Sequence, residues 1–340
     1  MTNPITFCVS TCNNLNYLKL AVHSVRTYSH FKNAPFIIFA ENCNDGTYEW
    51  LAQNTEKYNL SWFNEDNTEG NIKGIGGGMN ECAKHVETEY IMFLHADFFV
   101  SKNWDLECLK IFEKYPNQKL WVSSQRFQPN CFKENDRPGT IFFPYEDFGY
   151  KHDDFKEDWF IEYAEAFSRL NPNVEVEKGE GVSGLIRKVD WDYIGGNDPI
   201  YAPAYWEDTD LFIRIQLAGF KFVMTTNSVV FHFGSRSDKS NFPTDEIVRS
   251  ERSKAYEQKG AQNFFKKWGF WPVHNEHGFV TFPPNIDKSK YEHLIKLFTT
   301  VMCPHCKKEN KIYSGDIKKQ WYNKCEYCNL LYSCYDVKKL

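Results

Sequence analysis

The segment that most constrains the fold is Tyr90–Asp97, with the sequence YIMFLHAD, because it is apolar until a final histidine and aspartate. A short continuous apolar run of this kind is typical of a strand that is buried on both faces of a parallel sheet. In open α/β sheets, ligands bind beyond the carboxyl ends of the strands. The sequence therefore predicts that Asp97 lies at a ligand-binding edge of a sheet.

Strand patterns alternate with helical patterns along much of the chain. Strands are expected at residues 5–10, 35–40, 60–63, 90–97, 182–187 and 222–231. Helices are expected from about 15 to 25, after 47 through 58, from about 80 to 86, at 209–219 and at 245–259. This alternation predicts an α/β fold with a mostly parallel central sheet flanked by helices.

Composition narrows the function classes. The net charge of −5 argues against non-specific nucleic-acid binding by the whole chain of 340 residues. No apolar run approaches the ~20 residues of a membrane span, and the first residues lack the pattern of a secretory signal. We therefore expect a cytoplasmic protein without a transmembrane segment, and we interpret its 11 cysteines as thiols or metal ligands.

Two C-x-x-C pairs mark the C-terminal segment, 299–340. Cys303 and Cys306 are separated from Cys325 and Cys328 by eighteen residues, a spacing typical of a four-thiolate zinc ribbon. A structural Zn²⁺ explains how a segment with so small a core would fold. Two disulfides are the alternative, and Cys334 is a spare thiol. The segment is locally basic, yet protein contact or bracing of the rest of the chain is a simpler role than nucleic-acid binding.

The motifs before residue 299 resemble, in order and spacing, those of family 2 glycosyltransferases, which adopt the GT-A fold. The matching segments are 9–14 with 17–18, 41–47, 67–70 with Asn80, 95–97 in the place of the D-x-D motif, 195–198, and 206–211 with Arg214. The resemblance covers roughly residues 5–237. It implies a GT-A catalytic domain at 1–240, a helical or irregular extension at 241–298 and the zinc ribbon at 299–340.

The resemblance also implies a metal site for the diphosphate of a nucleotide sugar. Asp97 is the expected ligand, and His95 stands where the family has its first aspartate. An imidazole at this position favours Mn²⁺ or another transition ion over Mg²⁺. His232 resembles the histidine that completes this site in several family members. The alternatives are that His95 ends a strand in the core and that His232 is a satisfied core residue among aromatic side chains.

For catalysis, the resemblance points to Asp208 as the base that takes the proton of the acceptor hydroxyl, with Glu207 orienting the base or the acceptor. It implies a single displacement with inversion and an oxocarbenium-like transition state. The alternative is that Glu207, Asp208 and Asp210 only offset the dipole of a helix N-terminus.

For the donor, Thr11 and Glu41 are the expected contacts to the base and ribose of a UDP-sugar or another nucleoside-diphosphate sugar. Lys73 is a candidate for a phosphate or base contact, with a solvated lysine as the alternative. Gly74 and the glycines at 76–78 predict a flexible or pocket-lining loop. We expect the acceptor, a glycan or another glycoconjugate, to contact the aromatic and acidic stretch 142–167, which contains Tyr145, Trp159 and Phe160.

Two other functions remain open. A sugar nucleotidyltransferase would share a similar sheet, but that class resembles G-x-G-T-R-L near the first strand, where this chain has Ser10-Thr11-Cys12-Asn13. An inactive GT-A-like domain that serves as a zinc-ribbon scaffold is the second alternative, with His95 in the place of an aspartate as its evidence.

Overall fold

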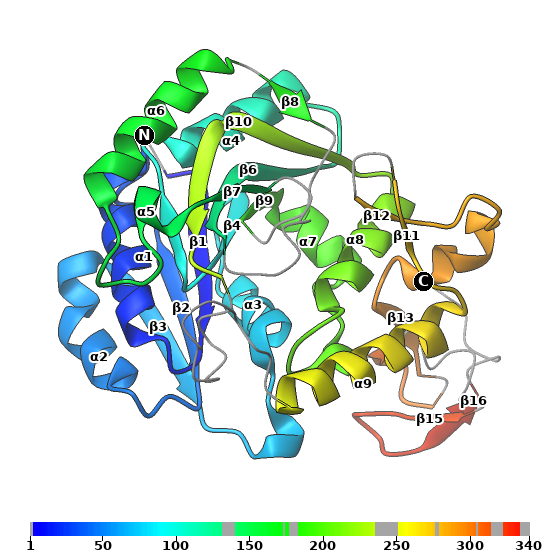
Figure 1. Ribbon diagram of the computed structural model, residues 1–340. Helices are drawn as coiled ribbons and strands as arrows, with labels where there is room; N and C mark the ends of the chain where they lie inside the picture. Colours follow the sequence, from blue (N-terminus) through cyan, green and yellow to red (C-terminus); the bar gives the residue numbers. More distant parts are fainter. Residues whose placement is uncertain are drawn as a thin grey trace.

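A ten-stranded sheet forms the centre of the molecule (Figure 1). The computed structural model describes residues 3–130, 140–172, 174–176, 183–234, 251–275, 279–303, 305–313 and 322–333. The strands of the sheet are β1 Ile5–Thr11, β2 Phe36–Glu41, β3 Leu60–Glu65, β4 Tyr90–His95, β5 Phe98–Val100, β6 Leu120–Pro129, β7 Thr140–Phe143, β8 Glu175–Val176, β9 Gly184–Arg187 and β10 Lys221–His232. The central order is β3-β2-β1-β4-β9-β6-β10-β5, with β7 on β6 and β8 on β10.

The pairing confirms the predicted mostly parallel sheet. β1 is parallel to β2 and β4, β2 to β3, and β6 to β7 and β10. β9 runs antiparallel to both β4 and β6, and the short strands β5 and β8 run antiparallel to β10. Because β9 reverses direction between β4 and β6, the strands β1, β4 and β10 all point their carboxyl ends to the same edge.

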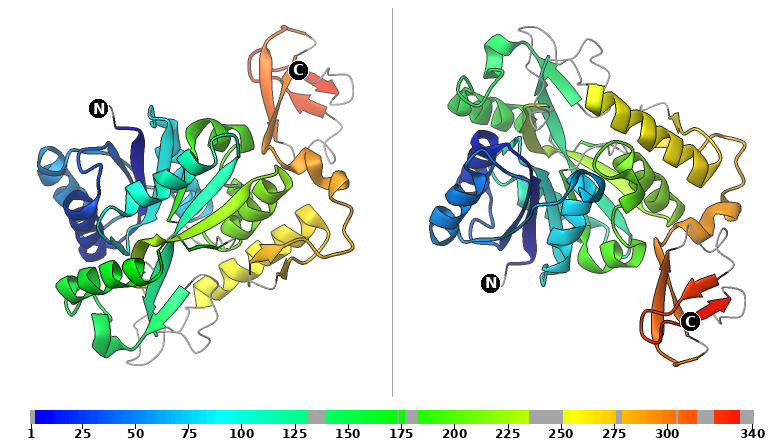
Figure 2. Two further views of the ribbon diagram at one scale, coloured as in Figure 1. Left: turned by 90° about the horizontal axis from the view of Figure 1, so that it is seen from above. Right: turned by 90° about the horizontal axis from the view of Figure 1, so that it is seen from below.

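Helices cover both faces of the sheet (Figures 1 and 2). They are α1 Leu15–Tyr28, α2 Thr47–Tyr58, α3 Gly74–Lys84, α4 Trp104–Lys114, α5 Tyr145–Phe148, α6 Glu157–Leu170, α7 Lys188–Ile194, α8 Glu207–Leu217 and α9 Glu251–Trp268. Alternate side chains of β1 face opposite layers, as the pleat requires: Phe7 packs in the core under α1, α2 and α4, and Cys8 in the core under α3, α7, α8 and α9. A third core, rich in phenylalanine, lies between α6 and β10.

The glycine-rich segment 74–78 is the first part of helix α3, which corrects our expectation of a loop. Close packing explains the glycines. A Cβ on Gly78 would lie 2.1 Å from Ser10 Oγ and 2.7 Å from the ring of Phe39, and one on Gly74 would overlap the backbone of Pro203. The glycines therefore let α3 approach β1, β2 and the segment before α8, which outweighs their low helix propensity.

Two other parts of the sequence prediction need correction. β6 is a central strand, although it is not among the strands expected from the sequence. Its polar side chains hide the strand signal because its serines and glutamines are buried: Ser124 Oγ lies 2.6 Å from Ser228 Oγ, and Ser123 Oγ has no hydrogen-bond partner among the described residues. The expected helix at 245–259 is observed from Glu251 to Trp268; residues 245–250, and Val182 of the expected strand 182–187, lie outside the described residues.

The C-terminal segment forms small antiparallel hairpins at the side of the molecule opposite α1 and α2 (Figure 2). Their strands are β13 Phe298–Met302 with β14 Glu309–Tyr313, and β15 Tyr322–Lys324 with β16 Leu331–Ser333. Before them, β11 Val273–His274 pairs with β12 Val280–Thr281. In the described residues, no helix combines the length and the apolar character needed to cross a membrane.

Candidate active site and cysteine cluster

Three predicted metal ligands meet at the carboxyl-end edge of the sheet. His95 ends β4, Asp97 lies in the turn between β4 and β5, and His232 ends β10. One ligand atom from each residue lies within 4.8 Å of the others, so the three side chains can share one ion. The backbone carbonyl of Asp97 accepts a hydrogen bond from the N–H of Phe233 at 3.0 Å, which ties the turn to the end of β10.

Hydrogen bonding orients His232 for metal binding. Its Nδ1 lies 3.0 Å from Gln128 Oε1 on β6. A carbonyl oxygen only accepts, so Nδ1 carries the proton of this contact, and Nε2 is the ring nitrogen that faces Asp97 Oδ2, at 3.4 Å. Our sequence analysis did not identify Gln128. Only its position on β6, beside β10, reveals it, because no motif connects residues 128 and 232.

His95 has a nitrogen that no protein group occupies. Its Nε2 is buried and has no hydrogen-bond partner within the described chain. Burial lowers the pKa of His95 to about 4, so the imidazole is neutral and able to act as a ligand. Two imidazole nitrogens and one carboxylate form a donor set that suits a transition ion better than Mg²⁺.

The residues expected to contact the nucleotide follow β1 and β2. Thr11 ends β1, and its buried Oγ1 has no hydrogen-bond partner among the described residues. Glu41 ends β2 and is buried. Its carboxylate accepts hydrogen bonds from the N–H groups of Lys73 and Gly74, both at 2.8 Å, and from the Asn67 amide at 2.8 Å. In this structure Glu41 thus fixes the start of α3, and its contact to a ribose stays a prediction.

Lys73 has acidic partners of its own. Its Nζ lies 2.6 Å from a carboxylate oxygen of Glu65 and 2.9 Å from one of Glu81. Lys73 is therefore not the solvated lysine of our alternative, since its charge is shared between two carboxylates. Its side chain also lines a small cavity, so its contact to a phosphate stays a prediction.

Glu207 begins α8 and lines the same small cavity, with Gly76, Gly77, Tyr201 and Pro203. Its Oε2 is buried and has no hydrogen-bond partner within the described residues. Burial, and secondly the charge of Asp208, raises the pKa of Glu207 to about 8. Glu207 therefore carries a proton through most of the neutral range and is a hydrogen-bond donor there.

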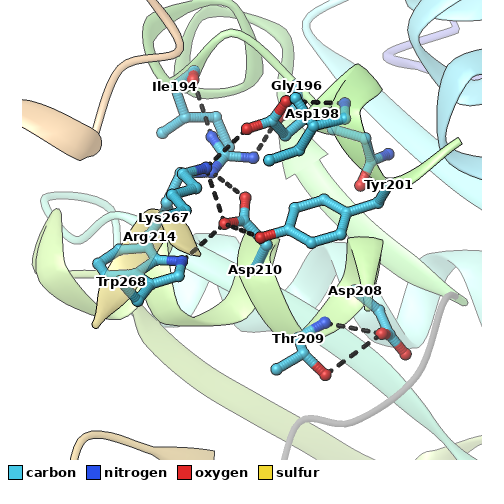
Figure 3. Close-up of polar contacts among 12 residues, drawn as sticks. Ile194, Gly196, Asp198, Tyr201, Asp208, Thr209, Asp210, Arg214, Lys267 and Trp268 are labelled. Atoms are coloured by element: carbon cyan, nitrogen blue, oxygen red, sulfur yellow. Dashed lines mark hydrogen bonds and ion pairs between the residues drawn. The ribbon is translucent and has the colours of Figure 1, made fainter. Parts of the chain in front are cut away.

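Asp208, the second residue of α8, is exposed. Figure 3 shows its contact with Thr209. Its Oδ1 accepts a hydrogen bond from the N–H of Thr209 at 2.7 Å. Asp210 is different, because it is fully buried and its carboxylate pairs with Arg214 at 2.8 Å and Lys267 at 2.7 Å. The alternative in which all three acids only offset the helix dipole is therefore wrong for Asp210.

The four cysteines of the C-x-x-C pairs also come together. One sulfur from each lies within 4.8 Å of the others. The sulfurs of Cys303 and Cys328 are 3.8 Å apart, and those of Cys306 and Cys325 are 3.5 Å apart, well beyond the ~2.05 Å of a disulfide. The two-disulfide alternative does not describe this structure, in which all four are free thiols. Cys334 lies outside the described residues.

Both cysteine turns have the same backbone. The N–H of Lys307 donates to the carbonyl of Cys303 and that of Asn329 to the carbonyl of Cys325, both at 3.0 Å. Lys307 and Asn329 each adopt a left-handed conformation, with φ of 58° and 59°. This repeat places two sulfurs on each turn and points all four at one centre, which is the donor set of a tetrahedral Zn²⁺ site.

One family model matches the N-terminal part of the chain. The family model for Glycosyl transferase family 2 matches residues 6–170, slightly less than half of the 340 residues. This match covers the segments up to His95 and Asp97 and ends before α8 and β10. A search of curated proteins finds no match.

Solved structures give more distant likenesses. TarS of S. aureus is 15% identical over 68% of this chain and 36% of its own, with a TM-score of 0.45, so this chain spans about a third of that protein. TarS 1–349 in complex with UDP-GlcNAc is 11% identical over 86% of this chain and 70% of that one (TM-score 0.45). GalNAc-T7 with UDP, GalNAc and Mn²⁺ is 12% identical over 78% and 51% (TM-score 0.49). At these scores the likenesses add nothing to the argument about function.

Proposed function

We propose that this protein is an inverting, metal-dependent glycosyltransferase that moves a sugar from a nucleoside-diphosphate sugar to an acceptor hydroxyl. The observation that carries the proposal is the group of His95, Asp97 and His232 at the ligand-binding edge of the sheet, in which the buried His95 Nε2 has no hydrogen-bond partner among the described residues. The family match over residues 6–170 supports the reaction class. The catalytic domain is 1–240, followed by the extension 241–298 and the ribbon 299–340.

The three residues would hold Mn²⁺, with Mg²⁺ as the less suitable ion. Bound there, the ion supplies positive charge that neutralises the leaving diphosphate. The chain's own part is to hold the ligands in place, through the Gln128 contact to His232 and the backbone bond between Asp97 and Phe233. A four-thiolate Zn²⁺ in the ribbon is a separate, structural ion, since all four of its positions are filled by cysteines.

The two acids that begin α8 have different roles in this proposal. Asp208 is exposed and takes the proton of the acceptor hydroxyl. Glu207 holds its own proton near neutral pH, because burial raises its pKa to about 8, so it donates a hydrogen bond to the acceptor and does not compete as the base. This assignment keeps the roles that the family resemblance implied and adds a protonation state to one of them.

Thr11 is the nucleotide contact with the best support, because its hydroxyl at the end of β1 is buried without a hydrogen-bond partner among the described residues. Glu41 and Lys73 complete the donor pocket in the proposal, and a UDP-sugar is the expected donor. To contact the donor, Glu41 has to release hydrogen bonds that it now accepts from backbone N–H groups, and Lys73 has to release its ion pairs with two carboxylates.

Exposed aromatic rings beside α8 support a carbohydrate acceptor. Trp206, directly before Glu207, lies 5.8 Å from the ring of Trp271, which stacks on Phe265 at 5.1 Å. Trp271 is 50% and Phe265 44% exposed, so ring faces are available to the apolar faces of sugars. In the stretch 142–167, Trp159 is exposed, but Phe160 is fully buried. Phe160 is therefore a core residue that an acceptor does not reach, and its replacement would disturb the core.

The first experiment is a binding panel of UDP, GDP, dTDP and CMP, with and without Mn²⁺, on wild type and Asp97→Ala. We expect one nucleotide, UDP, to bind in the presence of Mn²⁺ and to lose at least tenfold in affinity in the variant. If no nucleotide binds to a folded, metal-supplied protein, the transferase proposal fails, and the inactive scaffold becomes the better function.

A second experiment tests the base. Asp208→Asn should keep the affinity for the nucleotide and lower kcat by about 10²–10⁴-fold, because the site loses its proton acceptor but little of its shape. Asp192→Asn, an exposed acid at the end of α7, is the control and should transfer at the wild-type rate. Transfer by Asp208→Asn at the rate of this control would assign the base to another residue.

A further inference from the structure

The ribbon contacts the rest of the chain at a buried carboxylate. Tyr313, the last residue of β14, donates its hydroxyl hydrogen bond to Asp198 Oδ2, and Asp198 is only 2% exposed. In the hairpin register, Met302 and Glu309 pair at the end next to Cys303 and Cys306, and Phe298 pairs with Tyr313 at the other end. The hairpin therefore reaches from the cysteine cluster to Asp198.

Asp198 belongs to a buried network of charges (Figure 3). The ammonium of Lys267, on α9, lies 2.7 Å from Asp198 Oδ2 and 2.7 Å from Asp210 Oδ1. Asp210 also accepts from Arg214 Nε at 2.8 Å and from Trp268 Nε1 at 2.8 Å. Two carboxylates and two cations balance, which is the condition under which such charges are tolerated away from water.

This network holds the elements that form the wall of the Glu207 cavity. Asp198 accepts from the N–H of Ile200 at 3.1 Å and so shapes the turn that contains Tyr201. Asp198 and Tyr201 line the cavity together with Glu207. Asp210 lies three residues after Glu207, in the first turn of α8. The same set of ion pairs thus fixes the turn, the start of α8 and the end of α9.

We propose that the metal-loaded ribbon is a strut that positions the first turn of α8 through Tyr313 and Asp198. Loading of the four cysteines fixes the hairpin, the hairpin holds the Tyr313 hydroxyl on Asp198, and the network then holds Glu207 at the cavity and Asp208 next to it in the chain. Tyr313 is a positioning residue, since it acts through Asp198. The inference rests on the proposed function for its effect on the reaction, but its structural effect is measurable without any substrate.

The chemistry of the contact suits a permanent strut. Burial and the neighbouring Asp198 raise the pKa of Tyr313 far above its ordinary range, so the phenol keeps its proton and remains a donor. A hydrogen bond to a buried carboxylate is among the stronger ones, and its loss leaves Asp198 with a lone pair that water cannot easily reach.

The first test uses Tyr313→Phe, which removes one hydroxyl and keeps the ring that packs at 6.1 Å from Phe298. The control is Tyr327→Phe, because Tyr327 is a ribbon tyrosine that is 56% exposed. We expect kcat of Tyr313→Phe to fall by about tenfold, with the KM of the donor and the Kd of the nucleotide unchanged. Kinetics equal to those of the control, or equal losses in kcat and nucleotide affinity, would overturn the positioning role.

The second test follows amide hydrogen exchange in the first turn of α8 while the metal is removed. Zinc is stripped from wild type and from Tyr313→Phe by a chelator, the chelator is removed, and Mn²⁺ is restored to both. Exchange in α8 should rise in wild type and return to its first value on addition of Zn²⁺. In Tyr313→Phe it should be high from the start and insensitive to zinc.

The outcomes separate this inference from the proposed function. A rise in α8 exchange of the same size in both proteins, or no rise in wild type, refutes the strut, as does a purified protein whose four cysteines bind no zinc. If no nucleotide binds in the panel but exchange in α8 follows zinc as expected, the strut stands and the transferase proposal fails.

Discussion

Replacement of Glu207 by glutamine should make the protein more stable at high pH and leave its stability unchanged at low pH. The reason is the buried Oε2 beside the carboxylate of Asp208, for which the described residues supply no partner to compensate a negative charge. The pKa of Glu207 is raised from 4.5 to about 8. A carboxyl with a raised pKa in the folded state binds its proton more tightly there than in the unfolded chain.

The sign and the size follow from this difference. Below pH 4.5 Glu207 is protonated in the folded and the unfolded state and does not lower the free energy of unfolding. Between pH 4.5 and about 8 the free energy of unfolding of the wild type falls as the pH rises, and above pH 8 the full loss is present. At about 1.4 kcal/mol for each pKa unit, the ceiling is about 5 kcal/mol. With an unfolding entropy of ~2 cal/mol/K for each residue, a chain of this length converts that ceiling to roughly 7 °C in melting temperature.

The assay is the melting temperature of wild type and Glu207→Gln from pH 5 to pH 9. We expect agreement within about 1 °C at pH 5 and a variant that melts about 3–7 °C higher at pH 9. Glu113→Gln, at an exposed position of α4, is the control and should follow the wild type at every pH. A difference between Glu207→Gln and wild type that does not change with pH would show that Glu207 ionises normally in the folded protein.

Two further variants test packing and the cysteine cluster. Gly78→Ala should lower the free energy of unfolding by about 1–3 kcal/mol, because its Cβ would lie 2.1 Å from Ser10 Oγ. The control Gly70→Ala adds a Cβ with no heavy atom within 4 Å and should be neutral. Urea unfolding compares the two variants, and equal midpoints would contradict the packing argument. Metal analysis should find one zinc for each chain, and Cys303→Ser should lose it. Cys12→Ser is the control and should keep the zinc, because the Cys12 thiol is exposed and lies outside the cluster. Equal zinc in both variants would place the ion elsewhere.

Local sequence patterns correctly predicted the elements in which apolar side chains are buried or in which the spacing of residues defines a turn. The run before Asp97 is a buried strand because every one of its apolar residues packs in a core, and the C-x-x-C pairs come together because their spacing already defines two turns. β6 was missed for the opposite reason. Its serines and glutamines are buried, and a strand with buried polar side chains does not alternate in the way that a half-exposed strand does.

In the candidate site, too, the sequence predicted some features and not others. Motif order was enough to select His95, Asp97, His232, Glu207 and Asp208, because each follows or begins an element that the sequence marks. The sequence did not show how different the surroundings of these residues are. Glu207 and Asp208 are adjacent acids in the sequence, yet the fold buries an oxygen of the first and exposes the second, so only the structure shows that the pKa of Glu207 is raised.

The sequence by itself determined the α/β alternation, the residues that reach the carboxyl-end edge of the sheet and the two cysteine turns, because these depend on contacts between near neighbours in the chain. The tertiary structure alone decided that Gln128 orients His232, that glycines form the start of a helix, and that Tyr313 of the ribbon contacts Asp198. These pairings join residues about a hundred positions apart or depend on the space left by another element. No local pattern records them, since packing selects them only after the sheet and its helices have come together.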